Sequence, residues 1–244
     1  MNLREWGDTA MECRNLPTQE RILLAAEKLF AEKGYKETTT REIVREAGAS
    51  LSSLQAHFQG KENVYFEVRR RAIEELHQIM RPVLDEARYM DNQGLLYGEI
   101  VWSLLSEIIS KYTEWCFDEE RWYAVTLINR ELVDGVPIPD LPEKPIAEMF
   151  LVMQFLCERY AESEAVSWSA IIGQIFFSSL LSFSGYAFQR DPNKRRNFTM
   201  PLSRDEVKYQ VKSYILLSLR AYLDIRRKGG EKSAGRESAD TVEP

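Results

Sequence analysis

The sequence predicts an all-α fold in which a small N-terminal helical domain is joined by a long helix to a larger helical domain. Apolar residues recur at helical spacing along most of the 244 residues, whereas the alternation typical of strands is almost absent. Segments rich in proline, asparagine and charge, at 134–142 and 191–203, separate the later helices. A hydrophobic content of 44% supports substantial cores.

The first helix is expected to follow a disordered extension at residues 1–17. Pro17 and Thr18 are typical of a helix start, and Gly34 is placed to end the helix. Apolar side chains recur on one side of it, at Ile22, Ala25, Ala26, Leu29 and Phe30.

Two short helices joined by a glycine turn are predicted within residues 39–58. Thr39 and Glu42 have the spacing of a capping box, and Ser50 is placed to cap the second helix. Gly48 supplies the backbone freedom for the turn between them. Helices this short cannot fold alone, so we expect them to pack against the first helix. The predicted core contains Phe30, Ile43, Leu54 and Phe58.

The second short helix presents a surface suited to DNA. No acidic residue lies between Ala47 and Gly60, and the outward side chains are hydroxyls, an amide and an imidazole. Such groups bond to phosphate oxygens or base edges, and a helix-turn-helix places this helix in the major groove. A helical hairpin with no role in DNA binding has the same local pattern and remains an alternative.

Residues 18–81 resemble the N-terminal domain of TetR-type transcriptional regulators. Beyond the amphipathic first helix, the matching positions are Phe30, Gly34, Tyr35, the threonine run, Ile43, Ala47, Gly48, Ser50, His57, Phe58 and Lys61. The chain departs from the family's usual residues at Gln55 (tyrosine), Ser52 (glycine) and Leu51 (often lysine). These departures concern individual DNA contacts rather than the fold. The resemblance implies a C-terminal domain that encloses a small-molecule pocket.

The expected DNA-binding residues lie in the helix-turn-helix and at the start of the next helix. Lys61, beside a helix N-terminus that itself attracts anions, is expected to hold a phosphate. The full set is Thr39, Thr40, Arg41, Ser50, Leu51, Ser52, Ser53, Gln55, His57 and Lys61.

A fourth helix from Lys61 is expected to run beyond Pro82 and to enter both domains. The predicted domains are 18–81 for DNA binding and 82–227 for effector binding and dimerisation, with a disordered tail at 228–244. Later helices are expected near 93–116, 119–133, 144–162, 166–189 and 205–227.

Aromatic residues are dense in the middle of the chain. They pack either as core or, as the resemblance implies, around an apolar or aromatic effector. The candidate ligand-binding residues are Trp102, Tyr112, Trp115, Phe117, Trp122, Tyr123, Asn129 and Arg130. Asn129 and Arg130 are equally consistent with a surface polar cluster.

The stretch 165–189 contains no charged residue and is long enough to cross a bilayer, but its serines, glycines and glutamines favour a helix buried by protein. We therefore expect no membrane association and place a dimer interface here and on 205–227. The candidate interface residues are Gly173, Phe177, Leu181 and Gly185.

Charge and cysteine content narrow the function further. The net charge of the chain is −6, yet residues 18–81 hold 11 Lys and Arg against 10 Asp and Glu. The excess of acidic residues therefore lies outside the segment proposed to bind DNA. Three cysteines without paired spacing are compatible with a reducing cytoplasm. No catalytic, cofactor or metal motif is present, so we expect neither an enzyme nor a cofactor.

The sequence therefore predicts a cytoplasmic DNA-binding transcriptional regulator. The most favoured form is a repressor that binds a pseudo-palindromic double-stranded DNA operator as a homodimer and is released by a small-molecule effector. One recognition helix contacts too few base pairs for genomic specificity, which is why two copies are expected. The alternative is a TetR-shaped interaction protein that has lost sequence-specific DNA binding.

Overall fold

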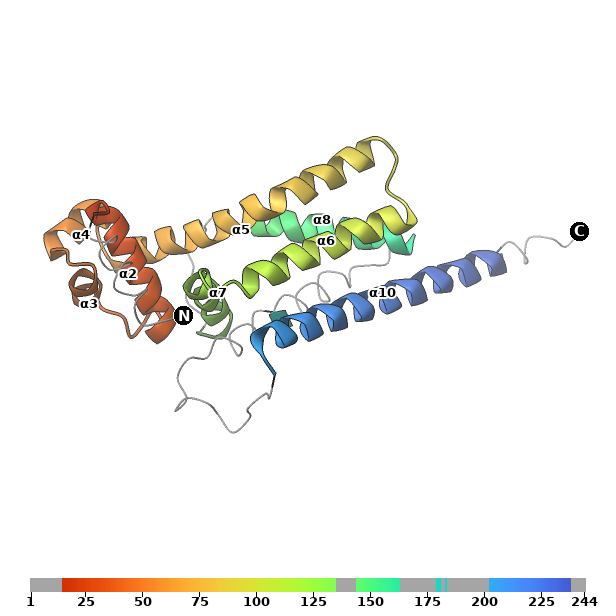
Figure 1. The fold of residues 1–244 in the computed structure, drawn as a ribbon. Coiled ribbons are helices and arrows are strands. Elements are labelled where there is room, and N and C mark those ends of the chain that lie inside the picture. The colour runs from red at the N-terminus through yellow and green to blue at the C-terminus, as the bar shows by residue number, and fades with distance from the viewer. Residues whose placement is uncertain (1–14, 135–143, 163–178, 181–182, 184–201, 238–244) are drawn as a thin grey trace, which may run out of the picture. The chain divides into compact units, whose positions relative to one another are not determined.

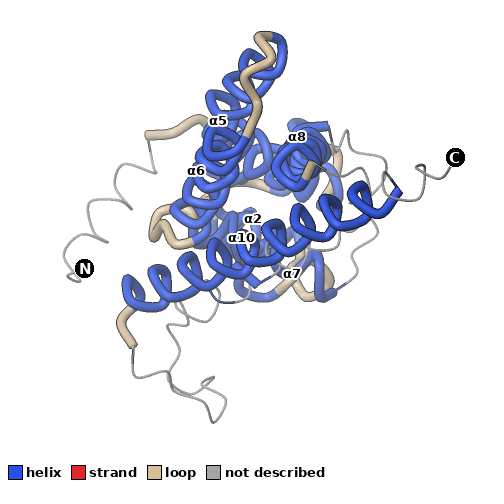
Figure 2. The backbone as a smooth tube through the Cα atoms, turned by 90° about the vertical axis from the view of Figure 1, so that its right-hand side faces the viewer, coloured by secondary structure: helices blue, strands red, loops and turns tan. Residues whose placement is uncertain are grey.

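The computed structural model describes residues 15–134, 144–162, 179–180, 183 and 202–237. These residues form helices without any strand, which confirms the predicted all-α class (Figures 1 and 2). The helices are α2 (Thr18–Lys33), α3 (Thr40–Glu46), α4 (Leu51–Phe58), α5 (Lys61–Asn92), α6 (Gly98–Cys116), α7 (Trp122–Asp134), α8 (Lys144–Ala161) and α10 (Arg204–Glu237).

The chain divides into two compact units. The N-terminal unit comprises Met1–Ile73 and Glu120–Pro139, and the C-terminal unit comprises Glu74–Glu119 and Asp140–Pro244. This division differs from the expected boundary at residue 81 in two ways. Helix α5 divides between the units after Ile73, and α7, which the sequence suggested would belong to the C-terminal domain, lies in the N-terminal unit.

The core of the N-terminal unit forms where α2, α3, α4 and the start of α5 meet. The predicted core residues Phe30, Ile43, Leu54 and Phe58 are all buried together in it. Leu127 of α7 joins the same cluster and is 1% exposed. Burial of an apolar side chain of this size stabilises a fold by roughly 1.5–3 kcal/mol, which accounts for the position of α7 against α2.

An ion-pair network ties α2 to the first part of α5. Arg71 donates to both carboxylate oxygens of Glu20, at 2.7 and 2.8 Å, and it also contacts Glu67. Both bonds to Glu20 come from Nη1, and Nε contacts Glu67, so one guanidinium connects α2 with α5.

The C-terminal unit is built on α6, α8 and α10, with the later part of α5. Their inward faces are mainly apolar, including Leu105 and Ile108 of α6, Leu156 of α8 and Leu219 of α10, all at most 1% exposed. Glu148 of α8 accepts from His77 at 2.9 Å and also pairs with Arg88, so both long-range contacts fix α5 against α8.

Two expectations for the later chain have different outcomes. The tail was expected to be disordered from residue 228, but α10 continues to Glu237. Extension of an existing helix adds one hydrogen bond per residue and needs no burial, unlike starting a new one. The uncharged stretch 165–189 lies almost entirely outside the described residues. In the part of the chain that the structure does describe, no helix is both long enough and apolar enough to cross a bilayer.

Candidate nucleic-acid interface

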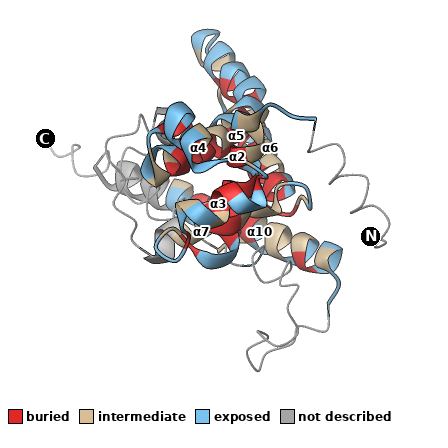
Figure 3. Cartoon of the chain, turned by 90° about the vertical axis from the view of Figure 1, so that its left-hand side faces the viewer, coloured by how far each residue is buried: buried red, intermediate tan, exposed pale blue. Residues whose placement is uncertain are grey.

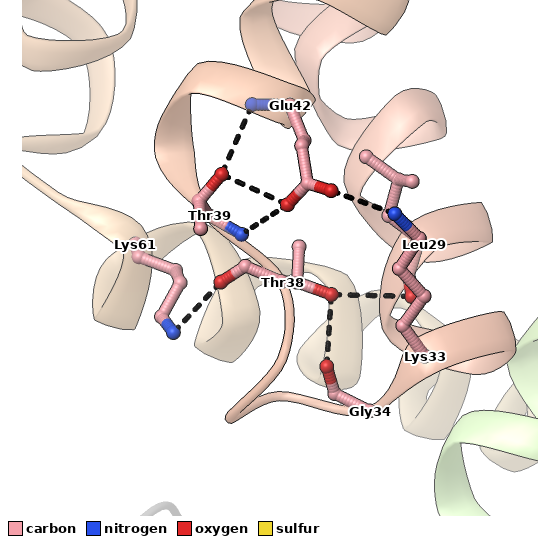
Figure 4. A network of polar contacts seen from close by, with 7 residues as sticks. All are labelled: Leu29, Lys33, Gly34, Thr38, Thr39, Glu42 and Lys61. Carbon is pink, nitrogen blue, oxygen red and sulfur yellow. Dashed lines mark hydrogen bonds and ion pairs between the residues drawn. The ribbon is translucent and has the colours of Figure 1, made fainter.

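Helix α3 begins at the capping box predicted from the sequence. The Thr39 N–H donates to Glu42 Oε2 at 2.9 Å, and the Glu42 N–H donates back to Thr39 Oγ1 at 3.3 Å (Figure 4). The bond from Lys33 Nζ to Glu42 Oε1, at 2.7 Å, adds a tie to α2. The Lys33 ammonium, followed by the two Thr39 donors, lowers the pKa of Glu42 to about 2.

The turn between α3 and α4 depends on Gly48, whose φ is +57°. Only glycine adopts this left-handed conformation without a steric cost from Cβ. A Cβ built there would meet Arg21 at 3.7 Å, an ordinary contact, so the constraint is conformational rather than spatial. The turn thus sets the angle at which α4 leaves α3.

The first turn of α4 is closed by three serines. Ser50 caps the helix, since its Oγ accepts from the Ser53 N–H at 3.0 Å. The same Oγ lies 2.9 Å from Ser52 Oγ and 2.8 Å from Ser53 Oγ. The three hydroxyls therefore form one local cluster, and each retains only part of its hydrogen-bonding capacity for a DNA contact.

The end of α4 uses Gln55. Its Nε2 donates to the carbonyl of Gln59, at 2.9 Å, and Gln59 adopts the left-handed conformation with φ of +64°. Gln55 thus stabilises the C-terminus of its own helix. One of its two N–H groups is thus used within the protein, which leaves the other N–H and Oε1 for a base contact.

The predicted DNA-binding residues all lie in the N-terminal unit, on α3, on α4, at the ends of these helices and, for Lys61, at the start of α5. Exposed residues line the outer sides of α3 and α4 (Figure 3). Most of them are exposed, as a DNA contact requires: Thr39, Arg41, Ser50, Leu51, Ser52, Gln55 and His57. Thr40, Ser53 and Lys61 are half-buried. Leu54 and Phe58 point the opposite way, into the core. One face of α4 is therefore free for a partner.

Lys61 has a structural role that the sequence did not indicate. Its ammonium donates to the carbonyls of Tyr35 and Thr38, at 2.8 and 2.9 Å, and lies 4.3 Å from the centre of the Tyr35 ring. Burial lowers its pKa, partly offset by the charge of Glu37. Two of its three donors are thus used within the protein, and one remains for a phosphate.

Thr38 completes this network, a role that the threonine run did not indicate. It is fully buried, and its hydroxyl lies 2.8 Å from the Gly34 carbonyl and 3.2 Å from that of Leu29 (Figure 4). Lys61, Thr38 and the capping box together connect the end of α2, the start of α3 and the start of α5. These three helix ends position the helix-turn-helix.

The candidate ligand-binding residues divide between the two units. Trp102, Tyr112, Trp115 and Phe117 belong to the C-terminal unit, whereas the remaining four, on α7, belong to the N-terminal unit: Trp122, Tyr123, Asn129 and Arg130. The side chain of Asn129 lies outside the described residues. The helix at 119–133 was expected in the C-terminal domain, whereas α7 lies in the N-terminal unit.

Arg130 bonds to the backbone at the end of α2. Its Nε donates to the carbonyl of Ala31 at 2.7 Å, and one terminal nitrogen donates to that of Glu32 at 2.9 Å. These are two of the last four carbonyls of α2, which have no partner within the helix. Gly34 N–H bonds a third, Phe30, at 2.9 Å. Arg130 therefore caps the C-terminus of α2.

Three of the four candidate aromatic residues of the C-terminal unit, Tyr112, Trp115 and Phe117, pack as core. Tyr112 and Trp115 stack with ring centres 6.0 Å apart and are at most 4% exposed. Trp115 Nε1 is buried with no hydrogen-bond partner in the described structure. Trp102 is half-buried and lies under the Arg220 guanidinium, 5.0 Å from the ring centre.

The four candidate dimer residues, Gly173, Phe177, Leu181 and Gly185, lie outside the described residues. Helix α10, the other expected dimer element, exposes three large side chains along one side. Tyr214 and Leu217 are each 71% exposed, and Ile225 is 69% exposed. Their separations of 3 and 11 residues correspond to about one and three helical turns, so they form a stripe.

Comparisons with known proteins point to the same helix-turn-helix domain. A family model described as bacterial regulatory proteins of the tetR family matches residues 22–68. The chain is 35% identical over 122 residues to the HTH-type transcriptional regulator QacR of Staphylococcus aureus strain Mu50, covering 47% of this chain and 60% of QacR. It therefore spans less than two thirds of that relative. It is also 28% identical over 159 residues to the HTH-type transcriptional repressor BepR of Brucella suis biovar 1, covering 63% and 71%.

The fold is also similar to that of solved structures. The TetR family transcriptional regulator PfmR from Thermus thermophilus superposes with a TM-score of 0.55 at 23% identity, covering 80% of this chain and 97% of PfmR. An identity this low speaks for the fold alone. The family match over residues 22–68, in α2 to α5, and the helix-turn-helix geometry show that this part of the chain is a domain of the kind found in bacterial regulatory proteins of the tetR family.

Proposed function

We propose that this protein is a transcriptional repressor that binds a pseudo-palindromic operator as a homodimer and is released by a small-molecule effector. The observation that carries the proposal is the free face of α4. It has a capped start, no acidic residue and an exposed row of small or polar side chains. A helix of this kind fits the major groove, where a carboxylate would be repelled by the phosphates.

Repression is supported by the relatives, since BepR is named as a repressor. Both BepR and QacR are described as HTH-type transcriptional proteins, and the match includes the helix-turn-helix.

The homodimer is supported by the exposed stripe on α10. Tyr214, Leu217 and Ile225 would lie in water in a monomer, although they form one apolar side of a long helix. A second copy of the same helix would cover this stripe, and a two-fold arrangement would place two α4 helices on two half-sites. The uncharged stretch 165–189 remains the second proposed dimer element.

The effector site is proposed in the C-terminal unit, around the buried aromatic pair Tyr112 and Trp115. An unpaired buried N–H is costly, and Trp115 Nε1 could donate to a polar group of an otherwise apolar or aromatic effector. Substitution of Trp115 is expected to reduce the response to effector while leaving the DNA binding of the free protein unchanged.

Two helices could transmit the response. Helix α5 runs through both units, and α7 belongs to the N-terminal unit but is joined by the chain to the C-terminal unit at both ends. An effector that favours one arrangement of these helices would change the spacing of the two α4 helices. A 5- to 150-fold loss of operator affinity needs a coupling free energy of only about 1–3 kcal/mol, and DNA must weaken effector binding to the same degree.

An electrophoretic mobility shift with DNA from upstream of the protein's own coding region tests the central claim. We expect a complex that resists an excess of random duplex, because specific binding exceeds non-specific binding by about 10³–10⁷-fold. Equal competition by random duplex would favour the alternative, an interaction protein of this fold that no longer reads sequence. Substitution of Ser52 or Gln55 should change sequence preference if their side chains reach base edges.

A further inference from the structure

The outward face of α4 carries one large apolar side chain. Leu51, the first residue of the helix, is 48% exposed, whereas Leu54 and Phe58 of the same helix are 0% and 6% exposed. Burial in the core therefore does not explain Leu51. A single exposed leucine is common on any protein surface, so its meaning depends on where it lies and on what its neighbours can do.

The neighbouring polar groups are already used within the protein. The hydroxyls of Ser50, Ser52 and Ser53 bond to one another or to the helix N-terminus, at 2.8–3.0 Å. Gln55, one turn beyond Leu51 on the same side, donates its amide to Gln59. Each of these residues already uses part of its hydrogen-bonding capacity within the protein, whereas the Leu51 side chain has no hydrogen bonds to make.

The position of Leu51 suits base contact. In a helix-turn-helix the N-terminal residues of the second helix lie closest to the base edges. Among the groups that the four base pairs present in the major groove, the C5-methyl of thymine is the apolar one. Contact between a leucine side chain and this methyl removes apolar surface of both from water and requires no polar group to be left unpaired.

We propose that Leu51 is a specificity-determining residue that selects a thymine in each operator half-site through its C5-methyl group. The inference rests on the proposed function, since it assumes that α4 enters the major groove of a specific operator. It adds the chemistry by which one position of that operator is chosen. The chain departs here from the lysine common in its family, which would favour phosphate or guanine instead.

The experiment begins with selection of bound sequences from a random duplex pool by the full-length protein. Each thymine of the selected half-site is then replaced by deoxyuridine in both halves, which removes only the methyl group. With the unaltered protein we expect one position at which this replacement weakens binding about 4-fold per half-site, or roughly 15-fold for both, at fixed salt. This measurement needs no protein variant and so does not depend on a variant's folding.

The same scan is repeated with Leu51→Ala and with Leu24→Ala. Leu24 is the matched control, because it is also an exposed leucine of the N-terminal unit, at 41%, but lies on α2. Leu51→Ala should bind the thymine and deoxyuridine operators equally, and Leu24→Ala should retain the full difference.

Two failures are distinguishable. If the selection enriches no sequence, the proposed function itself is contradicted, because the protein does not bind DNA sequence-specifically. An enriched operator with no methyl-dependent thymine, or with a dependence that persists in Leu51→Ala, would overturn the role of Leu51 and leave the function standing.

Discussion

Glu42 combines a capping role with an ion pair, and its acidity makes that role measurable. Its pKa is about 2 in the folded protein, below the ordinary value of 4.5, because Lys33 and the two Thr39 donors favour the carboxylate. Above pH 4.5 the carboxylate is charged in both folded and unfolded chains, so its stabilising effect is fully present. As the pH falls from about 4.5 to about 2, the unfolded chain takes up the proton first and this stability is lost.

The variant Glu42→Gln tests this account. Glutamine can still serve in a capping box but cannot carry the charge. We expect the variant to be less stable than the parent at pH 7, with a difference that shrinks steadily as the pH falls from about 4.5 to about 2. Chemical denaturation across this range measures it. A difference that does not change with pH would mean that the charge of Glu42 contributes nothing.

Lys61 is expected to affect both folding and DNA binding. Lys61→Met keeps the aliphatic stem but leaves the carbonyls of Tyr35 and Thr38 without their charged donor, which should cost about 1–3 kcal/mol of unfolding free energy. If the third N–H holds a phosphate, the salt dependence of DNA binding should also fall in slope by about 0.9. Urea denaturation and affinity at several salt concentrations separate these effects.

The control for Lys61 is Lys36→Met, since Lys36 is an exposed lysine near the same loop. Its unfolding free energy should match that of the parent. Unchanged stability in Lys61→Met would show that the two carbonyl contacts are replaced by water at no cost.

At the scale of helices, the cap on α2 connects two distant parts of the chain. The C-terminal carbonyls of α2 are bonded by Arg130 from α7, and Leu127 packs beneath in the shared core. Helix α7 thus supports the helix on which α3 and α4 pack. A change in α7 should therefore reach the DNA-binding face without any direct contact with DNA.

Arg130→Met should weaken this support while preserving much of the aliphatic packing. Loss of charged bonds to two carbonyls that water can partly reach is expected to cost about 1–2 kcal/mol. Amide hydrogen exchange should rise at the end of α2, where protection depends on this cap. Arg226→Met, an exposed arginine of α10, is the control. Unchanged exchange in α2 of Arg130→Met would mean that α7 holds its place by apolar packing alone.

At the scale of the whole molecule, we expect the exposed stripe on α10 to determine the state of assembly. Leu217→Glu or Ile225→Glu introduces a charge that a second copy would have to bury, at a cost of several kcal/mol unless it is paired. We expect either variant to be monomeric by sedimentation and to bind the operator far more weakly, because one recognition helix would then act alone.

Arg226→Glu is the matched control for this test, since it places the same charge on α10 beside the stripe rather than in it. It should remain a dimer. If both stripe variants remain dimers with full operator affinity, the stripe on α10 plays no part in assembly, and the stretch 165–189 becomes the remaining candidate.

The local features of the N-terminal unit could be predicted from the sequence because each depends on residues only a few positions apart. The capping box, the Ser50 cap, the Gly34 and Gly48 turns and the small apolar core all lie where their spacing predicts. Long-range partners could not be predicted this way. Lys61 donates to carbonyls of residues that lie 26 and 23 positions away in the sequence. Arg130 donates to carbonyls of residues 99 and 98 positions away. A charged side chain on a helix gives the same sequence pattern whether it binds DNA, an effector or the end of another helix. The pattern therefore does not identify its partner. The choice among them depends on which backbone groups the packed helices leave without a partner, and packing alone brings those groups within reach.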